Sequence, residues 1–350
     1  MSIVGTPLHP PAEHTLNHVT LKDIAREVGV SVMTVSNVVN GNRGRVSPAT
    51  AARVERAIAD LGYVPNAAAQ SLAARRTRLV GLLLPTGSDD ASLLASPHDV
   101  AVTGAVEAAL RHRDHHLMLR GVGTARQVQD SVRRWSLDGV VLMGFTDDEV
   151  GALALPAGLP AVVVDATAGG PVAHVRSDDR AGGLLAGEHL TGLGHTRLLI
   201  CGPTETTSRV VSERVEGFRS VAGDRVQVVA AQTTYDDGVA LGARLVPAVR
   251  AGDLTAVFAT ADILAAGVIR GLTDHGLRVP EDVSVLGYDD ADLARYVTPR
   301  LSTIAQDTTR KGQVAAELLL ELITGEATEP RSALIDVALT ARESTGPAPA

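Results

Sequence analysis

The sequence of 350 residues predicts a multi-domain chain in which a small all-α head precedes a larger α/β core. Short helical patterns with polar caps lie within residues 19–78, and apolar runs of strand length then alternate with helical stretches. Charge divides at the same place: residues 19–78 hold nine Lys or Arg and four Asp or Glu, whereas residues 79–350 hold 23 and 35. A basic head on an acidic core predicts a polyanionic partner for the head alone.

The opening stretch and the single cysteine indicate the compartment. Residues 1–18 contain no Lys or Arg and are broken by prolines, so we expect a disordered lead-in and no secretory signal. No apolar run is long enough to span a membrane. Cys201 lies alone in an apolar run, which excludes a disulfide framework. The sequence therefore predicts a soluble cytoplasmic protein with no membrane partner.

Two short helices open the head. Thr20 precedes an apolar stripe over residues 21–28, and Gly29 ends it. Ser31 is the expected N-cap of a second helix, whose inward face is formed by Val35, Val38 and Val39. Two helices joined by a short turn containing glycine are the signature of a helix-turn-helix motif, and a third helix, starting at Pro48, completes the core of the head.

The outward positions of the second helix are Val32, Met33, Ser36 and Asn37. In a helix-turn-helix these positions enter the major groove, where the amide of Asn37 can pair with adenine through two hydrogen bonds. Ser31 and Thr34 lie near the helix N-terminus and are expected to contact phosphate, as are the arginines that follow the head. The alternative is a helical hairpin with a merely solvated polar face. The predicted DNA-contacting set is Ser31, Val32, Met33, Thr34, Ser36, Asn37, Asn66, Leu72, Arg75 and Arg76.

The stretches "TLKDIAREVGVSVMTVSNVVNG", "RVSPATAARVERAIADLGYVPN" and "AAAQSLAARRT" resemble the DNA-binding head and hinge helix of the LacI/GalR family of transcriptional repressors. The resemblance implies that residues 65–78 form a hinge helix that pairs with a second copy in the minor groove, with Leu72 as the wedge. Asn37 stands where the family usually carries arginine, so the operator sequence does not follow from a relative.

Nine apolar runs predict the strands of the core. Continuous Val, Leu and Ile runs such as "LVGLLLP" and "RLLICGP" are typical of parallel strands that are covered on both faces, and their alternation with helices predicts two doubly wound units. Ligands of such sheets bind beyond the carboxyl ends of the strands. Polar residues at those places are therefore the candidates for a binding site, namely Asp147, Asp165, Arg214, Asp262, Asp289 and Asp290.

The stretches "EHLTGLGHTRLLICGP", "ERVEGF" and "GLRVPEDVSVLGYDD" resemble the periplasmic-binding-protein-like core of the same family. The resemblance implies an effector between two subdomains and a set of binding residues: Phe145, Asp147, Arg214, Tyr235, Ala261, Asp289 and Thr308. Asp165 and Asp262 are taken as mainly structural, Asp290 as a possible helix cap, and Tyr288 as a further aromatic platform. Ala261 and Thr308 replace an asparagine and an aromatic that are common in the family.

The resemblance also implies the domain boundaries and three crossovers between the subdomains, near residues 176, 305 and 330. We expect a lead-in at residues 1–18, a helix-turn-helix head at 19–64 and a hinge helix at 65–78. The N-terminal subdomain is expected at 79–176 with 306–330, the C-terminal subdomain at 177–305 with 331–342, and a flexible tail at 343–350.

The sequence thus predicts a homodimeric regulator, most simply a repressor, that binds a pseudo-palindromic double-stranded DNA operator under the control of a small effector. A sugar is the family-based expectation; a nucleoside-responsive or effector-independent regulator of the same fold is the alternative. An enzyme is disfavoured because "GLLLPTGSDD" lacks the glycine pattern of a dinucleotide site and no nucleophile, base and orienting group converge by motif; no cofactor or metal is expected. A sugar-binding transport protein would have no use for the head.

Overall fold

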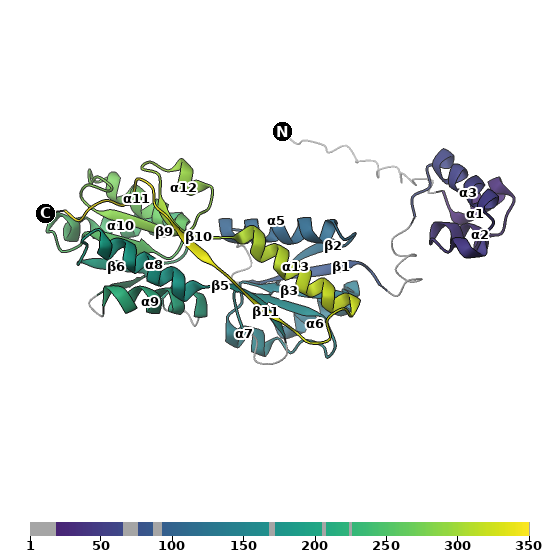
Figure 1. Cartoon of the computed structure of the whole chain (residues 1–350), viewed down its shortest axis with the longest axis horizontal. Coiled ribbons are helices and arrows are strands. Elements are labelled where there is room, and N and C mark those ends of the chain that lie inside the picture. Colours follow the sequence, from purple (N-terminus) through teal and green to yellow (C-terminus); the bar gives the residue numbers. More distant parts are fainter. Residues whose placement is uncertain are drawn as a thin grey trace, which may run out of the picture. The chain divides into compact units, whose positions relative to one another are not determined.

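The computed structural model describes residues 19–65, 76–86, 93–167, 172–204, 208–223 and 226–349, within two compact units, residues 1–77 and 78–350 (Figure 1). The predicted lead-in lies outside the described residues. So do Asn66, Leu72 and Arg75, together with most of the predicted hinge helix. Among the described residues, none of the helices combines the length and the apolar composition that crossing a membrane requires.

The head is a three-helix unit. Asp23 accepts a hydrogen bond from the backbone nitrogen of Thr20 at 2.9 Å and so completes the cap of the first helix. Gly29 ends this helix in the left-handed region at φ 72°, which glycine adopts without strain. Fully buried Ile24, Val35 and Val54 join the three helices. The helices are α1 (Leu21–Val28), α2 (Val32–Val39) and α3 (Pro48–Leu61), with a short 3-10 turn η1 (Arg43–Arg45).

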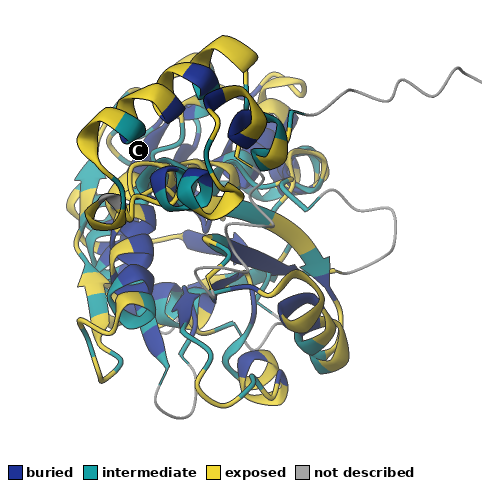
Figure 2. Ribbon diagram, turned by 90° about the vertical axis from the view of Figure 1, so that its right-hand side faces the viewer, coloured by how far each residue is buried: buried dark blue, intermediate teal, exposed yellow. Residues whose placement is uncertain are grey.

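The first subdomain of the core is built on a six-stranded sheet in the order β11-β5-β4-β3-β1-β2, in which neighbouring strands are parallel. Helices cover both of its faces, so its central strands are almost continuously buried (Figure 2). The strands are β1 (Leu79–Pro85), β2 (His116–Val122), β3 (Gly139–Met143), β4 (Ala161–Val164), β5 (Ala173–Ser177) and β11 (Ser332–Ile335). The helices are α5 (Pro97–Arg111), α6 (Ala125–Trp135), α7 (Asp147–Ala152) and α13 (Thr308–Thr324).

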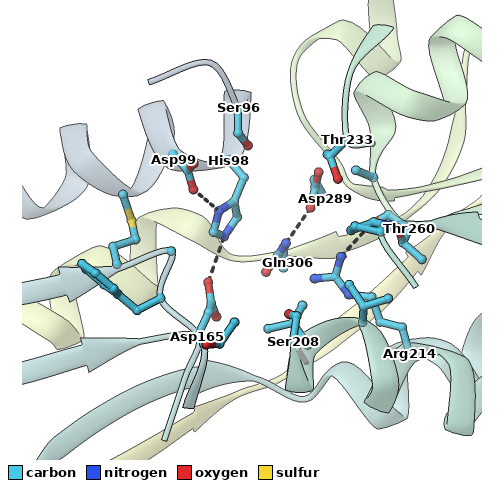
Figure 3. A pocket seen from close by; sticks show the side chains of 18 residues that line it. Ser96, His98, Asp99, Asp165, Ser208, Arg214, Thr233, Thr260, Asp289 and Gln306 are labelled. Atoms are coloured by element: carbon cyan, nitrogen blue, oxygen red, sulfur yellow. Dashed lines mark hydrogen bonds and ion pairs between the residues drawn. The ribbon is translucent and has the colours of Figure 1, made fainter. Parts of the chain in front are cut away.

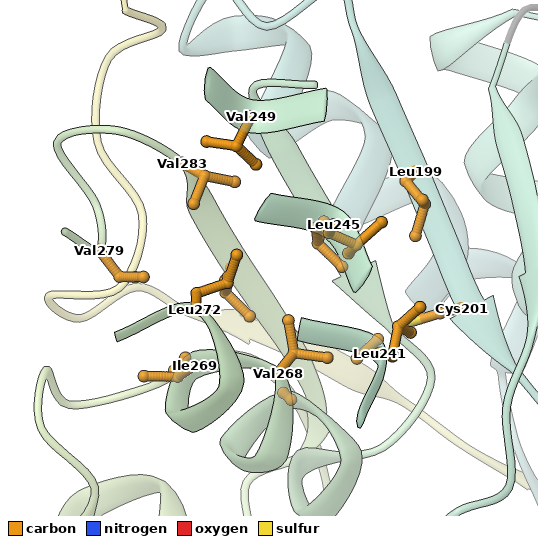
Figure 4. Close-up of a cluster of buried hydrophobic side chains, with 14 of the residues drawn as sticks. Leu199, Cys201, Leu241, Leu245, Val249, Val268, Ile269, Leu272, Val279 and Val283 are labelled. Carbon is orange, nitrogen blue, oxygen red and sulfur yellow. The ribbon is translucent and has the colours of Figure 1, made fainter. Parts of the chain in front are cut away.

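The second subdomain repeats this plan on a sheet in the order β12-β10-β9-β8-β6-β7, in which β12 is antiparallel to β10 and the other neighbouring strands are parallel. Alternate residues of each strand face opposite helix pairs: Leu199 and Cys201 pack towards α10 and α11 (Figure 4), whereas Ile200 packs towards α8 and α9. The strands are β6 (Leu198–Gly202), β7 (Gln227–Ala230), β8 (Ala256–Ala259), β9 (Ser284–Asp289), β10 (Ser302–Gln306) and β12 (Val337–Thr340). The helices are α8 (Asp179–Gly192), α9 (Arg209–Ala222), α10 (Tyr235–Arg250), α11 (Asp262–Thr273) and α12 (Leu293–Tyr296).

The chain crosses between the subdomains after β5, after β10 and between β11 and β12. The expected third crossover near residue 330 is wrong, because residues 332–335 pair with β5 in the first sheet and the chain reaches the second sheet only at Val337. The domain ranges shift accordingly, with 331–335 in the N-terminal subdomain. The sequence pattern did not predict β11, because the strand is short and only half-buried.

The expected flexible tail over residues 343–350 is also wrong for its described part. Ser344 is completely buried, and its hydroxyl donates to the carbonyl of Val285 at 2.6 Å. Gly346 lies against the buried imidazole of His195, whose Nε2 is 3.0 Å from the Gly346 carbonyl oxygen. The backbone nitrogen of Ala348 donates to Leu193. The C-terminal segment is therefore packed onto the second subdomain.

Candidate functional sites

The first candidate site is the exposed face of α2. Ser31 accepts a hydrogen bond from the backbone nitrogen of Thr34 at 3.1 Å and fixes the start of the helix. Val32 and Met33 follow with 41% and 69% of their surfaces exposed, although both side chains are apolar. Two adjacent exposed hydrophobic side chains at the N-terminus of a helix-turn-helix are placed to meet thymine methyl groups in a major groove. The structure thus leaves both side chains accessible, and their contact with bases stays a prediction.

Two further polar residues of α2, Ser36 and Asn37, differ in how far their hydrogen-bonding groups are already used within the protein. Ser36 accepts a hydrogen bond from the side-chain amide of Asn40 at 3.1 Å, so part of its capacity is used within the helix. Asn37 is half-exposed, and its backbone carbonyl accepts from Asn42. Arg53 of α3 donates to the backbone carbonyl of Val28 and closes the first helix against the third. The three helices share one buried cluster, which fixes the side of α2 that is left exposed.

The second candidate site is a cavity of about 370 Å³ between the two subdomains (Figure 3). Its volume falls within the roughly 300–1,000 Å³ that small-molecule sites occupy. Both subdomains and the β10 crossover strand contribute to its lining, and Phe145 is its only aromatic residue among the described lining. The lining consists of Ser96, His98, Asp99, Met143, Gly144, Phe145, Thr146, Asp165, Pro203, Ser208, Val210, Val211, Arg214, Thr233, Thr260, Ala261, Asp289 and Gln306.

Arg214 reaches the cavity from α9 and is held by the second subdomain. Its Nε donates to Asp179 at 2.8 Å, and its Nη1 donates to the carbonyl of Thr260 at 2.6 Å. The guanidinium carbon lies 3.5 Å from the ring centre of Tyr288, a cation–π contact. Tyr288 itself is completely buried, so the expectation that it serves as a platform for the ligand is wrong, because its ring supports Arg214 instead. The arginine fork is fixed before any ligand arrives.

Asp165 faces the cavity at the end of β4. Its Oδ1 accepts from Lys311 at 2.7 Å, and its Oδ2 lies 3.4 Å from Nε2 of His98, whose other ring nitrogen lies 3.2 Å from Asp99. Burial raises the pKa of Asp165, but Lys311 and His98 more than offset that effect, so its pKa is lowered overall. Asp165 is therefore an ionised acceptor. It was expected to be mainly structural, but the structure places it in the lining of the cavity.

Asp289 faces the same cavity from the end of β9. Its Oδ1 accepts from the amide of Gln306 at 2.6 Å. Burial raises the pKa of this carboxyl, and Arg214 and His98 lower it by less. The backbone of Asp289 lies at φ 126°, and that of Asp165 at φ 63°, conformations that few residues other than glycine adopt. Backbone strain of this kind concentrates at binding sites, and here it aims two carboxylates from opposite subdomains into one space.

Four of the seven residues expected to bind the effector line the cavity: Phe145, Arg214, Ala261 and Asp289. Three do not. Asp147 starts α7, and its carboxylate accepts from the backbone and hydroxyl of Thr167 at 2.7 and 2.5 Å. The same carboxylate lies 4.0 Å from Nη1 of Arg209 of the second subdomain, so protein groups already occupy it. Tyr235 starts α10 and is 41% exposed, and Thr308 lies in the first turn of α13, outside the described lining.

The remaining candidate aspartates are held by local partners. Asp262 is fully buried, accepts from the Thr303 hydroxyl at 2.6 Å, and has a pKa raised well above its usual value, chiefly by burial. Asp290 caps no helix; it pairs with Arg342. His98, Gln306 and Lys311 were missed. His98 and Lys311 lie in the first turns of α5 and α13, where a rule based on strand ends does not look. Gln306 is the last residue of β10, so the rule could have found it, but it was counted as part of the apolar run.

Comparison with known proteins agrees with this arrangement. Residues 20–66 match the model of bacterial regulatory proteins of the lacI family, and residues 188–345 match a periplasmic binding protein-like domain. The HTH-type transcriptional regulator CelR of Thermobifida fusca is 37% identical over 342 residues, 93% of this chain and 98% of the relative. The ribose operon repressor of Haemophilus influenzae is 32% identical over 337 residues, with the same coverages.

Two solved structures extend the likeness to three dimensions. A complex of CelR with cellobiose aligns with a TM-score of 0.68 at 34% identity, covering 93% of this chain and 100% of that one. A lac repressor dimer bound to operator and an anti-inducer aligns with a TM-score of 0.79 at 27% identity, covering 94% and 100%.

A helix-turn-helix head and a two-subdomain core with a cavity between the subdomains define a DNA-binding transcriptional regulator that is controlled by a small effector. The chain belongs to the lacI family of bacterial regulatory proteins.

Proposed function

We propose that this chain is a repressor that binds a pseudo-palindromic operator as a homodimer and releases or retains it according to a neutral sugar bound between the core subdomains. One observation carries the proposal: carboxylates from both subdomains, Asp165 and Asp289, and the fixed fork of Arg214 face one cavity. Carboxylates accept hydrogen bonds from vicinal hydroxyl groups, and an arginine fork donates to hydroxyl or ring oxygens.

The charges of the cavity favour a neutral ligand over an anion. Arg214 is paired with Asp179, and Lys311 is paired with Asp165, so both cations already have a carboxylate partner. A phosphate or carboxylate group would add negative charge beside Asp289, whose pKa burial already raises. Unphosphorylated sugars avoid this repulsion.

A nucleoside fits the cavity less well than a sugar. Base recognition gains from stacking between aromatic faces, and the described lining offers Phe145 alone, with alanine at 261. Two relatives support a sugar, since CelR was solved with cellobiose and one repressor is named for a ribose operon. A ligand that contacts both subdomains changes the angle between them, and a coupling of about 1–3 kcal/mol is enough to control operator binding.

A thermal-shift screen of the full chain tests the proposal. Cellobiose, ribose, glucose 6-phosphate and adenosine are the probes, because a ligand specific to the folded state raises the melting temperature. We expect a sugar to raise it and the phosphorylated sugar to do so less. The same sugar must then change the affinity of the protein for a DNA fragment selected by binding to it.

Two matched variants locate the binding. Asp289→Asn keeps the shape of the side chain, and we expect it to abolish the shift produced by the sugar. Asp292→Asn makes the same change three residues away at an exposed position that makes no side-chain cap, and should leave the shift intact. A shift that survives Asp289→Asn would place the ligand elsewhere.

A further inference from the structure

The two lysines of this chain differ completely in their surroundings. Of the 32 Lys and Arg residues, only Lys22 and Lys311 are lysines. Lys22 is exposed on α1, whereas the side chain of Lys311 on α13 is 0% exposed. Lysine is among the residues least often fully buried, and it is then paired. A chain that meets almost every other need for a cation with arginine uses lysine at this buried position.

The contacts of Lys311 explain the choice. Its ammonium nitrogen lies 2.7 Å from Oδ1 of Asp165, 2.8 Å from Oε1 of Gln306 and 3.2 Å from Nε2 of His98. A compact ammonium carries three donors that can point to three separate elements, here β4, β10 and α5. The flat, five-donor fork of arginine has neither that shape nor that size.

Lys311 also determines how Gln306 lies. The oxygen of the Gln306 amide accepts hydrogen bonds from the ammonium of Lys311 and from the hydroxyl of Ser177, the latter at 2.8 Å. Both partners are donors, so the oxygen must face them, and the amide nitrogen is left to donate to Asp289 at 2.6 Å. Asp165, Lys311, Gln306 and Asp289 therefore form a continuous chain of contacts from the first subdomain, through the β10 crossover, to the second.

We propose that Lys311 is the positioning residue of the effector site: without lining the cavity, it holds Asp165 directly and Asp289 through Gln306 where each meets the effector. This role rests on the proposed function, because it assumes that the two carboxylates bind the ligand. It also makes the separation of the two carboxylates, and with it the fit of a ligand, depend on the crossover strand.

The charges around Asp165 predict the result of removing the lysine. Asp165 faces Lys311 of α13, His98 of α5 and Arg214 of α9, and it also raises the pKa of Asp179 of α8. Burial raises the pKa of Asp165, and in Lys311→Met only the weaker effects of His98 and Arg214 still lower it. The pKa of Asp165 therefore rises in this variant. Asp165 then loses its charge as the pH falls, and with it part of the ligand's binding.

The first experiment compares Lys311→Met with Arg310→Met, which removes one exposed cation from the same helix. Cellobiose is the calorimetric probe, or ribose if it gives the larger thermal shift. We expect Lys311→Met to weaken binding by about tenfold or more, and more strongly at about pH 5.5 than at about pH 8. Arg310→Met should bind like the wild type at both pH values. Equal affinity of Lys311→Met and wild type would overturn the role.

A double variant separates positioning from simple support of the fold. Lys311→Met with Asp165→Asn removes both buried charges, so the stability lost in Lys311→Met should largely return. Sugar affinity should stay low, because the ionised acceptor is gone. Recovery of affinity together with stability would show that Lys311 only maintains the fold.

A spectroscopic measurement on the wild type covers the case in which Lys311→Met does not fold. Carbon-13 labelling of the lysine ε-carbons gives two side-chain signals, and we expect saturating sugar to move the Lys311 signal and leave that of Lys22 unchanged. An unmoved Lys311 signal with bound sugar would contradict the inference alone. If no sugar binds the wild type, the proposed function fails first and this role fails with it.

Discussion

At the scale of single residues, Arg214 is the best-held charge of the effector cavity. It is buried, paired with Asp179 and stacked on Tyr288. Removing one partner of a buried ion pair leaves the other charge without compensation. We expect Arg214→Ala to lower the free energy of unfolding by about 3–5 kcal/mol in urea titrations. Arg219→Ala, an exposed position on the same helix, should change it by less than about 0.5 kcal/mol. A similar small loss for Arg214→Ala would mean that Asp179 is not charged in the native protein.

Asn37 tests the reading face at the same scale. Its amide can pair with adenine in the major groove through two hydrogen bonds, and this discrimination is typically worth about 1–3 kcal/mol. We expect Asn37→Ala to relax the preference at one base position of each half-site in a selection from random DNA. Arg56→Ala, on the exposed side of α3, should leave the selected sequence unchanged. An unchanged sequence with Asn37→Ala would show that Asn37 does not read a base.

The sequence could not predict which of the candidate aspartates line the cavity. Asp147 and Asp165 each follow an apolar strand of the same sheet, and a rule based on strand ends does not choose between them. The structure separates them. Asp147 starts α7 and its carboxylate bonds Thr167, whereas Asp165 follows β4 with a left-handed backbone. Lys311 gave no signal at all, since only the packing of α13 on the first sheet brings it to the site.

At the scale of elements, two glycine pairs set the separation of α10 and α11. Gly238 and Gly242 on α10 face Gly267 and Gly271 on α11. A Cβ atom on Gly267 would lie 2.1 Å from the backbone oxygen of Tyr235, which is impossible without moving a helix. The absence of side chains at these positions lets the two helices approach closely over the second sheet.

We expect Gly267→Ala to lower the free energy of unfolding by about 1–3 kcal/mol, because the added methyl group overpacks the contact between α10 and α11. The matched control is Gly192→Ala at the end of α8, where a new Cβ meets nothing within 4 Å. Chemical denaturation of both variants measures the difference. Equal stability of the two would show that the helix pair can separate at little cost.

The C-terminal segment gives the second prediction for an element. Burial lowers the pKa of His195, whose Nε2 contacts Gly346 and Ser284. Acid therefore protonates the unfolded chain first, so stability is constant above the unfolded pKa of about 6.5 and falls as the pH drops below it. We expect His195→Gln to flatten this part of the stability curve in denaturation at several pH values. An unaltered slope would assign the loss to other groups, such as His189 and His174, whose pKa values are also lowered.

Elements with a strong pattern were the predictable ones. The capped helices of the head and the continuous apolar strands of both sheets appear where the sequence indicates them. Strands β5, β11 and β12 were missed, because they are four or five residues long and carry polar or exposed positions between the apolar ones. Their pairing depends on neighbours that are distant in the sequence, and that placed the third crossover too early.

At the scale of the whole molecule, the two compact units have hydrophobic cores of very different size. Among the residues that the structure describes, the head has eight buried residues in one hydrophobic cluster, whereas the core unit has four larger clusters. Small domains bury a smaller fraction of their surface and are correspondingly less stable. We expect calorimetry to show two transitions, with the head melting first. Selected operator DNA should raise only the first transition, and a bound sugar only the second. A single shared transition would show that the units fold as one.

The positions of the two lysines also determine how the protein is oriented when it is attached covalently to a solid support. Reagents that couple amines require an accessible side chain; of the two lysine side chains only Lys22 offers one, because Lys311 is sealed beneath the effector cavity. Covalent immobilisation through lysine would thus anchor the molecule by its DNA-reading head. A biosensor chip prepared in that way should report sugar binding faithfully and operator binding poorly.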